Sequence, residues 1–485
     1  MDEESNVCII CLMDTFYVTT PIYYVNDKPH IGHAYTTLIA DVYARFYRER
    51  LGAENVFFLT GTDEHGAKVA QSAEKNGIAP QEFTDKVSAE YKAVWKMLGI
   101  SYDEFFRTTD PRHKETVQAF LQNLYDKGYI YKAAYKGTYC IGCEKFLSFE
   151  EIVNGACALH PNLKLVEQEE ENYFFKMKEM SARVLEKLEA GAYSVFPEER
   201  KNEIIGKMKQ GIEDISISRV GVTWGVPVPW DPAHTVYVWV DALINYYSAT
   251  RIYPGREGFW PPTLHLMAKD ILWFHALVWE GLLLAHDLEL PKTVFAHGFF
   301  TIDGQKMSKS LGNVINPVDI VTEYGVDGAR YLLASAFQFG SDGDISLARF
   351  KEKFNSDLAN GIGNLVSRIA KLAEKLEVNP ADIERARLLA TQDETILRHF
   401  ESHRPDEALR YVWSKIAVLD ARMATDKPWE IADTGTLSQT LTSYIESLIT
   451  IGTLLRPFLP ETSEKILSIF TAQKITKPEP LFLRK

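Results

Sequence analysis

The spacing of apolar residues changes along the chain, and each change marks a different kind of structure. Residues 15–20 and 55–59 are short runs rich in β-forming residues, and between them apolar residues recur at helical spacing from His33 until Gly52. A second helix is expected after residue 59, ending near Gly77. Strand, helix, strand and helix in this order predict an α/β, Rossmann-like core with a doubly wound parallel sheet.

The second half of the chain returns to this pattern after an interruption at residues 129–175, which hold a cysteine cluster and an acidic run. Beyond Arg349 only helical spacing remains, which predicts an all-α helical bundle. Between these two regions the pattern predicts three strands and one helix, the strands at residues 236–240, 265–267 and 294–300 and the helix at residues 270–286.

Five parts follow from these patterns: a loose N-terminal extension, the first half of the α/β domain, an insertion, the second half of the α/β domain, and the helical bundle. We expect them at residues 1–13, 14–128, 129–175, 176–348 and 349–485.

The composition is that of a packed globular protein, with 46% hydrophobic residues among 485 and no apolar run long enough to cross a membrane. The net charge of −13 argues against non-specific coating of nucleic acid, although a local basic surface suffices to recognise RNA. Residues 1–13 resemble neither a secretory nor a mitochondrial leader, and five cysteines, an odd number, favour a reducing compartment, so we expect a cytoplasmic protein. Cys8 and Cys11 leave a second metal or redox site open, and Met13 an alternative start.

The turn His30-Ile31-Gly32-His33 lies between the first strand and the first helix. Backbone N–H groups and the helix dipole attract phosphate at such a point, and Gly32 leaves room for a nucleotide to approach closely. Both imidazoles can donate hydrogen bonds to a phosphate that gains charge in a transition state. Two ordinary histidines that cap a helix are the alternative.

The segment Lys306-Met307-Ser308-Lys309-Ser310 follows the last α/β strand and carries two ammonium groups. Such a loop can close over a triphosphate and neutralise charge as pyrophosphate leaves, whereas a solvated charged turn is the alternative. Because both motifs follow strands of one parallel sheet, they are expected to face one crevice at the carboxyl ends of the strands. We therefore predict a site for ATP with Mg²⁺, its catalytic candidates being His30, His33, Lys306 and Lys309. Further candidates for ATP binding are Gly32, Asp270, Ser308 and Ser310, where Asp270 either holds the ribose hydroxyls or caps a helix.

The two motifs, in this order, resemble those of class I aminoacyl-tRNA synthetases. Four further segments resemble the methionyl members of that class, and the resemblance extends from Phe16 to at least Trp429. These segments are TPIYYVN at residues 20–26, GTDEHG at 61–66, YVWVDAL at 237–243 and KDILWFH at 269–275.

The resemblance implies that Asp63 pairs with the α-ammonium of methionine, while the apolar thioether lies between aliphatic and aromatic side chains. Tyr246 and His275 are the candidates to approach the sulfur, and ordinary core packing is the alternative for each aromatic residue. The residues that match the pocket of the family are Ile22, Tyr24, Trp239, Ala242, Leu243, Tyr246, Phe274 and His275.

The distance between the two signature motifs, about 270 residues, also favours methionine. A pocket discriminates only about 10–200-fold per methylene, and for this reason synthetases for isoleucine, valine and leucine add a large hydrolytic editing domain. No domain of that size fits beside the sheet elements here.

The spacing Cys140-x2-Cys143-x13-Cys157-x2-His160 is that of a tetrahedral zinc knuckle, and Asn154-Gly155 predicts a turn just before the second pair. Four protein ligands leave no open position, so the single zinc ion is expected to be structural. Methionyl-tRNA synthetases carry knuckles in the matching insertion.

In the helical part, Asn360, Asn364 and Arg368 recur at a spacing of four residues and are expected on one helix face, and Trp429 follows a helix-breaking proline. They resemble the residues with which methionyl-tRNA synthetases read the CAU anticodon, although such side chains also serve to satisfy their neighbours. Because little sequence follows the bundle, we expect a monomer.

The function implied is ATP-dependent activation of L-methionine to methionyl-adenylate, followed by transfer to the 3′-terminal adenosine of tRNA(Met), including the initiator tRNA. Positioning and charge stabilisation carry the rate in such a reaction. The alternatives are a nucleotidylyltransferase acting on a small molecule and a non-catalytic RNA-binding paralogue.

Overall fold

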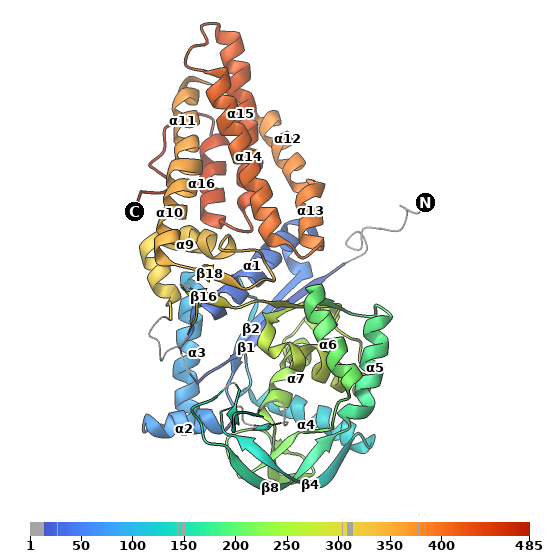
Figure 1. Cartoon of the computed structure of the whole chain (residues 1–485). Helices are drawn as coiled ribbons and strands as arrows, with labels where there is room; N and C mark the ends of the chain where they lie inside the picture. The colour runs from blue at the N-terminus through green and yellow to red at the C-terminus, as the bar shows by residue number, and fades with distance from the viewer. Residues whose placement is uncertain are drawn as a thin grey trace.

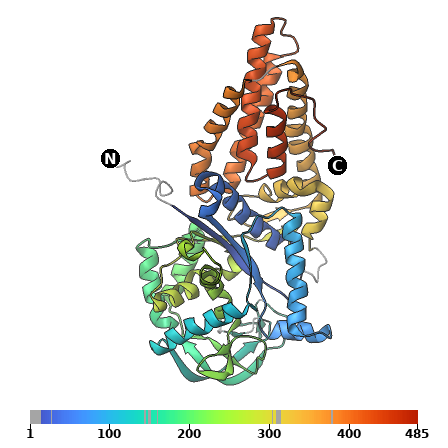
Figure 2. The same ribbon diagram turned by 180° about the vertical axis from the view of Figure 1, so that it is seen from behind.

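Six parallel strands form the central sheet of the computed structural model. The structure describes residues 14–26, 28–142, 145–147, 152–158, 160–302, 304–307, 314–376 and 379–485. Across the sheet the strands lie in the order β3 (Glu104–Arg107), β2 (Val56–Asp63), β1 (Phe16–Tyr24), β14 (Leu264–Ala268), β15 (Thr293–His297) and β9 (Ser194–Phe196). Figure 2 shows the long strand β1 running through the middle of the molecule.

Alternate residues of the two central strands are buried on opposite faces of this sheet. Phe16 and Val18 lie in one hydrophobic core, whereas Tyr17 between them lies in a second core. Phe58 and Phe57 of β2 divide in the same way. Both faces are therefore covered, as a doubly wound parallel sheet requires.

Helices cover the two faces (Figure 1). The core that contains Phe16 is formed with α1 (Ile31–Leu51), α3 (Pro80–Met97) and α9 (Pro317–Ala334). The core that contains Tyr17 is formed with α4 (Pro111–Asp126), α5 (Met177–Glu189), α6 (Glu198–Gln210), α7 (Val238–Ile252) and α8 (Trp279–His286). A short helix, α2 (Ala67–Lys75), follows β2.

The strand order reverses between β1 and β14. From β1 the chain continues to β2 and β3 on one side, whereas β14 and β15 lie on the other side. A crevice at the carboxyl ends of two such strands is where doubly wound sheets bind their ligands. The histidine turn, which follows β1, lies at this point of the fold.

The insertion is a separate antiparallel sheet built on a pair of long strands, β4 (Ile130–Cys140) and β8 (Val166–Phe175). The short strands β10 (Ile215–Ser216) and β5 (Lys145–Phe146) flank this pair. A small hairpin, β6 (Ile152–Val153) with β7 (Ala156–Cys157), turns at Asn154 and Gly155, whose φ angles are 53° and 75°. Both angles lie in the left-handed region that a two-residue hairpin turn requires, so the turn predicted from Asn154-Gly155 is confirmed.

Two smaller sheets flank the α/β core. One consists of β11 (Ser218–Val220), β13 (Asp231–Val236) and β12 (Pro227–Val228), and the other of β17 (Gln305–Lys306), β16 (Phe300–Ile302) and β18 (Gly343–Ile345). The strand predicted at residues 294–300 therefore belongs to two sheets, because β15 ends at His297 and β16 begins at Phe300.

The strand predicted at residues 236–240 is wrong. Val236 is the last residue of β13, and Val238 already begins helix α7. A run of β-branched and aromatic residues favours a strand locally, but Val240, Leu243 and Ile244 bury one face of a helix in the core, and this packing overrides the local preference.

The helix predicted at residues 270–286 exists but is not uniform. A 3₁₀ turn at Lys269–Ile271 is followed by the π-helix η6 (Phe274–Val278) and then by α8. A π-helical turn is rare and is frequently found at functional sites, and this one holds two of the predicted pocket residues, Phe274 and His275.

The described part of the chain after residue 349 contains helices, as expected. They are α10 (Leu347–Lys353), the π-helix η8 (Phe354–Gly363), α11 (Asn364–Leu372), the 3₁₀ helix η9 (Ala373–Lys375), α12 (Pro380–Thr391), α13 (Glu394–Glu401), α14 (Pro405–Asp426), α15 (Thr434–Leu455) and α16 (Pro460–Phe470). None of the helices in the described residues combines the length and the apolar character that a membrane crossing requires.

A buried arginine joins the bundle to the α/β domain. Arg330 of α9 forms an ion pair with Asp41 of α1 at 2.7 Å, and both side chains are fully buried. The guanidinium also donates to the backbone carbonyls of Pro457 and Phe458, which precede α16, at 3.0 and 2.8 Å. Since a buried charge needs all of these partners, the contact fixes the bundle against helix α1.

Candidate functional site

The histidine turn forms the N-terminal cap of α1. His30 is the cap residue, and its Nδ1 accepts a hydrogen bond from the backbone N–H of Gly32 at 3.1 Å. The Nδ1 of His33 accepts from the backbone N–H of His30 at 3.3 Å, and the two rings stack with centroids 3.7 Å apart. A Cβ at Gly32 would lie 3.0 Å from the ring of His30, so glycine at this position also leaves room for the capping imidazole.

Both imidazoles are held neutral. Burial lowers the pKa of His30 to about 4, and burial together with the neighbouring His30 lowers the pKa of His33 well below its ordinary value. Because each Nδ1 accepts a backbone N–H, the single ring proton is at Nε2. Each ring can therefore donate one hydrogen bond from Nε2 without carrying a charge, beside backbone N–H groups at a helix N-terminus.

The histidine turn and the segment after the lysine–serine loop are in direct contact. The backbone N–H of Ile31 donates to the carbonyl oxygen of Ile315 at 3.2 Å. Before the lysine–serine loop, Nε2 of His297 at the end of β15 forms a 2.6 Å hydrogen bond with the hydroxyl of Thr36 on α1. Residues before and after the lysine–serine loop thus contact α1 and the turn that begins it, and the contact between the two motifs themselves stays a prediction. Lys306 ends strand β17, and Ser308, Lys309 and Ser310 lie outside the described residues.

The predicted pocket residues come together in the core that contains Tyr17. Leu243 and Tyr246 are buried in it, and Ile22, Tyr24, Trp239 and Phe274 pack against it. The rings of Trp239 and Phe274 are stacked with centroids 4.1 Å apart. Ala242 is buried one residue before Leu243 on α7. The result is an apolar wall built from β1, α7 and η6.

Two polar groups stand in this wall. The hydroxyl of Tyr246 and Nε2 of His275 are 2.8 Å apart, and Nδ1 of His275 lies 3.0 Å from the carbonyl oxygen of Ile271. Burial lowers the pKa of His275 to about 4, so its ring is neutral. The carbonyl holds the proton at Nδ1, and the hydroxyl of Tyr246 therefore donates to Nε2.

Asp63 ends strand β2, beside Tyr24 in the register of the sheet, and is buried. Its backbone carbonyl accepts from Val25 at 3.1 Å, which ties the end of β2 to the end of β1. Burial raises the pKa of Tyr246, and the nearby charge of Asp63 contributes to the rise. The carboxylate of Asp63 thus lies near enough to Tyr246 for its charge to affect the ionisation of the Tyr246 hydroxyl.

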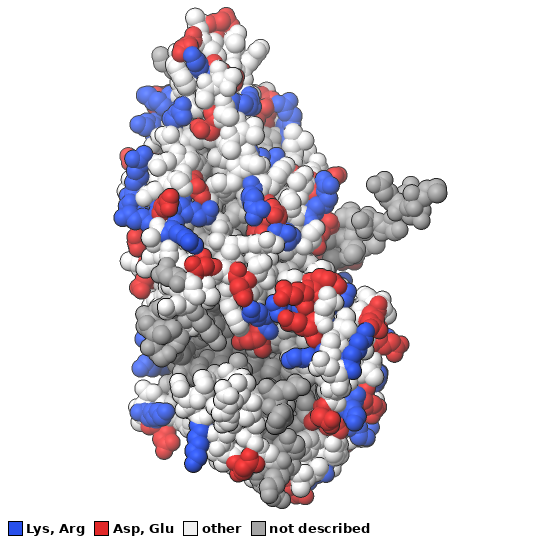
Figure 3. Space-filling model, viewed as in Figure 1, with Lys and Arg blue, Asp and Glu red and all other residues white. Residues whose placement is uncertain are grey.

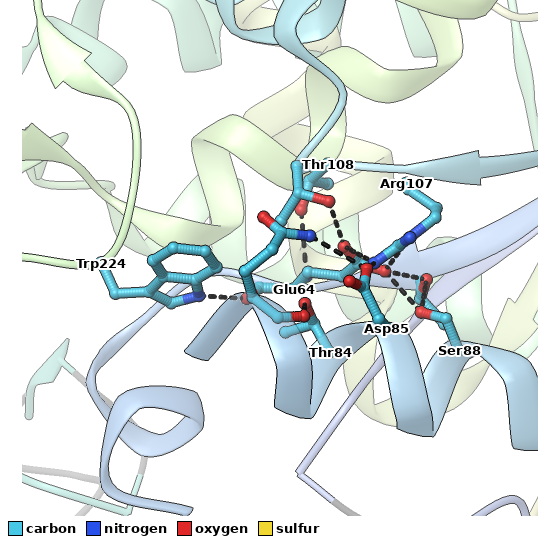
Figure 4. Close-up of polar contacts among 10 residues, drawn as sticks. Glu64, Thr84, Asp85, Ser88, Arg107, Thr108 and Trp224 are labelled. Atoms are coloured by element: carbon cyan, nitrogen blue, oxygen red, sulfur yellow. Dashed lines mark hydrogen bonds and ion pairs between the residues drawn. The ribbon is translucent and has the colours of Figure 1, made fainter. Parts of the chain in front are cut away.

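The residue after Asp63 locks this loop in place (Figure 4). The carboxylate of Glu64 is fully buried and accepts from Nε and Nη2 of Arg107 at 2.6 and 3.0 Å. Its backbone N–H donates to Thr108 at 2.9 Å, and its carbonyl accepts from the indole of Trp224 at 2.6 Å. The hydroxyls of Thr62, Ser88 and Thr109 complete the set around the carboxylate.

His65 joins the same loop to the helix that carries the pocket. Its Nδ1 lies 2.6 Å from Oδ2 of Asp241 on α7, and Oδ1 of Asp241 lies 3.0 Å from Nε2 of His113. The three side chains are at most 2% exposed. Burial by itself would raise the pKa of Asp241, but the charge of His65 and the hydrogen bonds from both histidines lower it.

Asp270 is exposed at the carboxyl end of β14, in a 3₁₀ turn whose cap is made by the backbone. Its neighbour Lys269 forms an ion pair with Asp342 at 2.7 Å, and Asp342 accepts from the backbone N–H of Phe299 at 2.7 Å. Asp270 thus lies at the carboxyl end of the strand next to β1, and its contact with the nucleotide stays a prediction.

Three of the four predicted metal ligands are brought together. The Sγ atoms of Cys140 and Cys157 each lie 3.9 Å from Nδ1 of His160, and both cysteines are buried. A tetrahedral zinc ion with ordinary bond lengths holds a sulfur and a nitrogen ligand about 3.6 Å apart, so these residues fit zinc. Cys143 lies outside the described residues, as do Cys8 and Cys11.

The knuckle contacts the active-site half of the molecule. Lys68 of α2 donates a hydrogen bond to the carbonyl oxygen of Gly142. A Cβ at Gly142 would lie 2.4 Å from the ring of His160, so glycine lets the chain pass close to this ligand. Because α2 follows the loop of Asp63 and Glu64, the metal site and that loop are only one helix apart.

The predicted anticodon residues lie on two different kinds of helix. Asn364 and Arg368 belong to α11, but Asn360 lies in the π-helix η8, which has non-helical dihedral angles at Gly361. The guanidinium of Arg368 lies 6.0 Å from the ring of Trp429, which is 53% exposed. A planar cation beside an exposed indole is a suitable platform for an unpaired base.

Four polar residues near the apolar pocket were not among the sequence-derived candidates: Glu64, His65, His113 and His265. His265 of β14 is buried, its Nδ1 lies 2.6 Å from the hydroxyl of Thr19, and its ring lies 4.4 Å from that of Tyr246. Glu64 and His65 stand inside the GTDEHG segment, which could have directed attention to them. His113 is recognisable only from its contacts, because its sequence neighbours carry no motif.

Comparisons with known proteins agree with this geometry. The sequence matches the family "tRNA synthetases class I (M)" over residues 16–168 and 148–370. It is 42% identical to the methionine–tRNA ligases of Clostridium acetobutylicum and Streptomyces coelicolor, in both cases over 93% of this chain and over 72% and 88% of theirs. The fold is similar to that of Mycobacterium tuberculosis methionyl-tRNA synthetase in complex with methionyl-adenylate, with a TM-score of 0.89 and 33% identity over 97% of this chain and 100% of that one.

The histidine turn, the carboxylate of Asp63 and the wall around Tyr246 thus occur together in a chain that matches one family along almost its whole length. The chain belongs to the methionyl-tRNA synthetases, which are class I aminoacyl-tRNA synthetases and methionine–tRNA ligases.

Proposed function

We propose that the chain activates L-methionine with Mg-ATP, releases pyrophosphate, and transfers the methionyl group from methionyl-adenylate to the 3′-terminal adenosine of tRNA(Met), including the initiator tRNA. The observation that carries this proposal is the direct contact between the histidine turn and the segment after the lysine–serine loop, from Ile31 to Ile315. The proposed phosphate-binding turn and the apolar pocket for the amino acid lie at the same edge of the sheet.

In the first step the methionine carboxylate attacks the α-phosphorus, and the bond from that phosphorus to pyrophosphate breaks. His30 and His33 donate from Nε2 to the phosphate oxygens as their charge rises, and the α1 N-terminus adds its dipole. Both rings are neutral, so this donation costs no desolvation of a buried cation. Lys306 and Lys309, with Ser308 and Ser310, hold the departing pyrophosphate.

Asp63 binds the α-ammonium of methionine, and Asp270 binds the ribose hydroxyls of ATP. The side chains of Ile22, Tyr24, Trp239, Ala242, Leu243 and Phe274 surround the thioether. The Tyr246–His275 pair lies against the sulfur, and discrimination against other apolar side chains comes from the polar pair in an otherwise apolar wall.

In the second step a ribose hydroxyl of the terminal adenosine attacks the carbonyl carbon of the adenylate, and AMP leaves with the bonding electrons. No side chain becomes a covalent nucleophile. The rate comes from positioning, and the buried contacts around Glu64 and Asp241 hold the loop of Asp63 and helix α7 in their geometry.

Cys140, Cys143, Cys157 and His160 would hold one structural zinc ion, which would stabilise the fold of the knuckle. Residues 14–128 and 176–348 form the catalytic domain, residues 129–175 its connective insertion, and residues 349–485 the anticodon-binding domain.

The CAU anticodon is bound by four residues of the helical domain: Asn360, Asn364, Arg368 and Trp429. We place the enzyme in the cytoplasm, where it charges tRNA for translation.

Amino-acid-dependent ATP–pyrophosphate exchange, measured with each of the twenty amino acids, tests this function. Exchange should depend on methionine, and purified tRNA(Met) should then be charged. Exchange with leucine, or with no amino acid at all, contradicts the proposal.

A further inference from the structure

Residues 481–485, called here the 481–485 segment, lie against the helices that carry the proposed anticodon residues. The ring of Phe482 meets that of Phe354 edge-on, with centroids 5.8 Å apart. A Cβ at Gly363 would lie 3.7 Å from Cδ2 of Phe482, so the phenyl ring is also in contact with the end of η8. This apolar contact anchors the segment on η8.

Hydrogen bonds fix the segment on the same helix. The amide side chain of Asn355 donates to a backbone oxygen of Lys485 at 3.0 Å and accepts from the backbone N–H of Lys485 at 2.9 Å. Arg484 donates from Nε to Oδ1 of Asn360 at 2.6 Å. Two asparagines of η8 therefore hold the last two residues of the segment.

The contact with Arg484 limits what Asn360 can do. Its carbonyl oxygen accepts from the arginine, so the side chain presents its amide N–H₂ group as a donor. The guanidinium of Arg484 keeps further N–H donors, and the residue is exposed. This end of the surface thus combines donors with a positive charge, which suits an acceptor-rich, anionic group such as a phosphate.

The other end of the surface has a different chemistry. Asn364 is exposed one turn further along, and Arg368 lies beside the exposed indole of Trp429 and 3.5 Å from Asp420. Amide edges and aromatic faces recognise unpaired bases, whereas a donor-only, cationic group positions a backbone without reading its sequence. Figure 3 shows Lys and Arg side chains along the edge of the bundle over α10 and α11, where the chain ends in Figure 1.

We propose that Arg484, held in place by Asn360, binds a backbone phosphate of the tRNA anticodon arm and so extends the anticodon surface onto the 481–485 segment. This inference rests on the proposed function, because it assumes that η8 and α11 meet the tRNA. Within the proposed anticodon surface, it assigns Asn360 with Arg484 to a phosphate-binding end and leaves Asn364, Arg368 and Trp429 as the base-reading end.

The test compares the full-length protein with its Arg484→Gln variant in titrations of a tRNA(Met) transcript between 50 and 200 mM KCl. Loss of one phosphate contact should weaken binding about 3- to 10-fold and make the negative slope of log K against log[salt] shallower by about 1. The weakening should be equal for transcripts with the CAU anticodon and with a changed anticodon. Methionine-dependent ATP–pyrophosphate exchange should be unchanged.

Arg398→Gln removes the same charge from α13, on the opposite side of the bundle from the chain end in Figures 1 and 2, and serves as the matched control. Arg484→Lys keeps the charge and should keep the salt slope of the original protein. Asn364→Ala, at the base-reading end, should instead reduce the preference for CAU and leave the salt slope as it is.

The inference is overturned if Arg484→Gln binds like Arg398→Gln, if Arg484→Gln loses anticodon preference at an unchanged slope, or if Arg484→Lys loses the slope as well. Failure of the proposed function has a different signature, since the unaltered protein would then show no preference for tRNA(Met) and Asn364→Ala would change nothing.

Discussion

Nδ1 of His65 and Oδ2 of Asp241 lie 2.6 Å apart in the buried interior, and this contact joins the two segments that form the proposed methionine site. His65 is two residues beyond Asp63, and Asp241 is one residue before Ala242 and two before Leu243. His113 binds the second oxygen of the same carboxylate and is itself 2.8 Å from the hydroxyl of Ser248. A carboxylate without solvent and with two imidazole partners fixes the distance between the ammonium-binding loop and helix α7.

Asp241→Asn should therefore make the methionine pocket less rigid, although Asp241 itself does not contact the substrate. We expect the free energy of unfolding to fall by about 2–4 kcal/mol, because the amide repels one of the two imidazole donors and loses the charge. The KM for methionine in exchange should rise more than the KM for ATP. Denaturant unfolding and exchange kinetics measure both effects. Asp287→Asn, which alters an exposed pair with Lys127, should change neither quantity; equal rises in the two KM values for Asp241→Asn would speak against a role in the methionine site.

His30→Asn separates the structural role of His30 from its catalytic role. Asparagine is a good N-cap and keeps α1 within about 1 kcal/mol of its original stability. It lacks the Nε2–H donor, so exchange should fall about 10²- to 10³-fold, the usual effect of removing one donor to a developing charge. Exchange and thermal unfolding are measured together. A variant that exchanges normally would show that His30 only caps the helix.

Buried neutral histidines make the stability depend on pH. Burial lowers the pKa of His297 to about 4, and it lowers the pKa values of His30 and His275 to about 4 as well. Since the folded-state pKa lies below the unfolded value near 6.5, the stabilisation is complete above pH 6.5 and is lost as the pH falls toward 4.

His297→Gln tests this dependence at a residue outside the proposed binding set. Glutamine accepts from Thr36 in place of Nε2 but does not titrate, so the decline of the unfolding free energy below pH 6.5 should become shallower by about 1.4 kcal/mol per pH unit. Urea unfolding between pH 5 and 8 measures the slope. An unchanged slope would mean that His297 is not held neutral by burial.

Removal of the metal should affect the knuckle first. Freshly purified protein should contain about one zinc ion per chain, and less than half an equivalent would contradict the site. A strong chelator, or Cys157→Ala, should expose the knuckle to proteases while the α/β domain stays folded. Exchange should also decline, because Lys68 links the knuckle to the helix that follows Glu64. Protease digestion followed by mass spectrometry of the fragments locates the cleavage.

Local spacing predicted much of the fold, because strands β1, β2 and β14 and helix α1 each have a periodicity that tertiary packing reinforces. It failed at residues 236–240, where β-branched residues fill the first turn of α7. The π-helix that holds Phe274 and His275 has no signature in apolar spacing, since one extra residue in a turn leaves the flanking pattern helical.

The residues of the site also fall into two groups, those that sequence motifs predicted and those that no motif could predict. The histidine turn, Asp63 and the pocket residues follow strands or lie on one helix, so motifs could point to them. The pairing of His65 with Asp241 joins positions 176 residues apart, and the pairing of Asp241 with His113 joins positions 128 apart. One sequence carries no trace of such a pairing. The same holds for Arg484 and Asn360, which are 124 residues apart.

The most direct test of the account is a crystal structure with a non-hydrolysable methionyl-adenylate analogue. The account predicts the α-ammonium against the carboxylate of Asp63, the sulfur against Tyr246 and His275, and Nε2 of His30 and His33 directed at the phosphate mimic. An analogue bound away from the β1–β14 crevice, or one whose thioether points away from Tyr246, would contradict it.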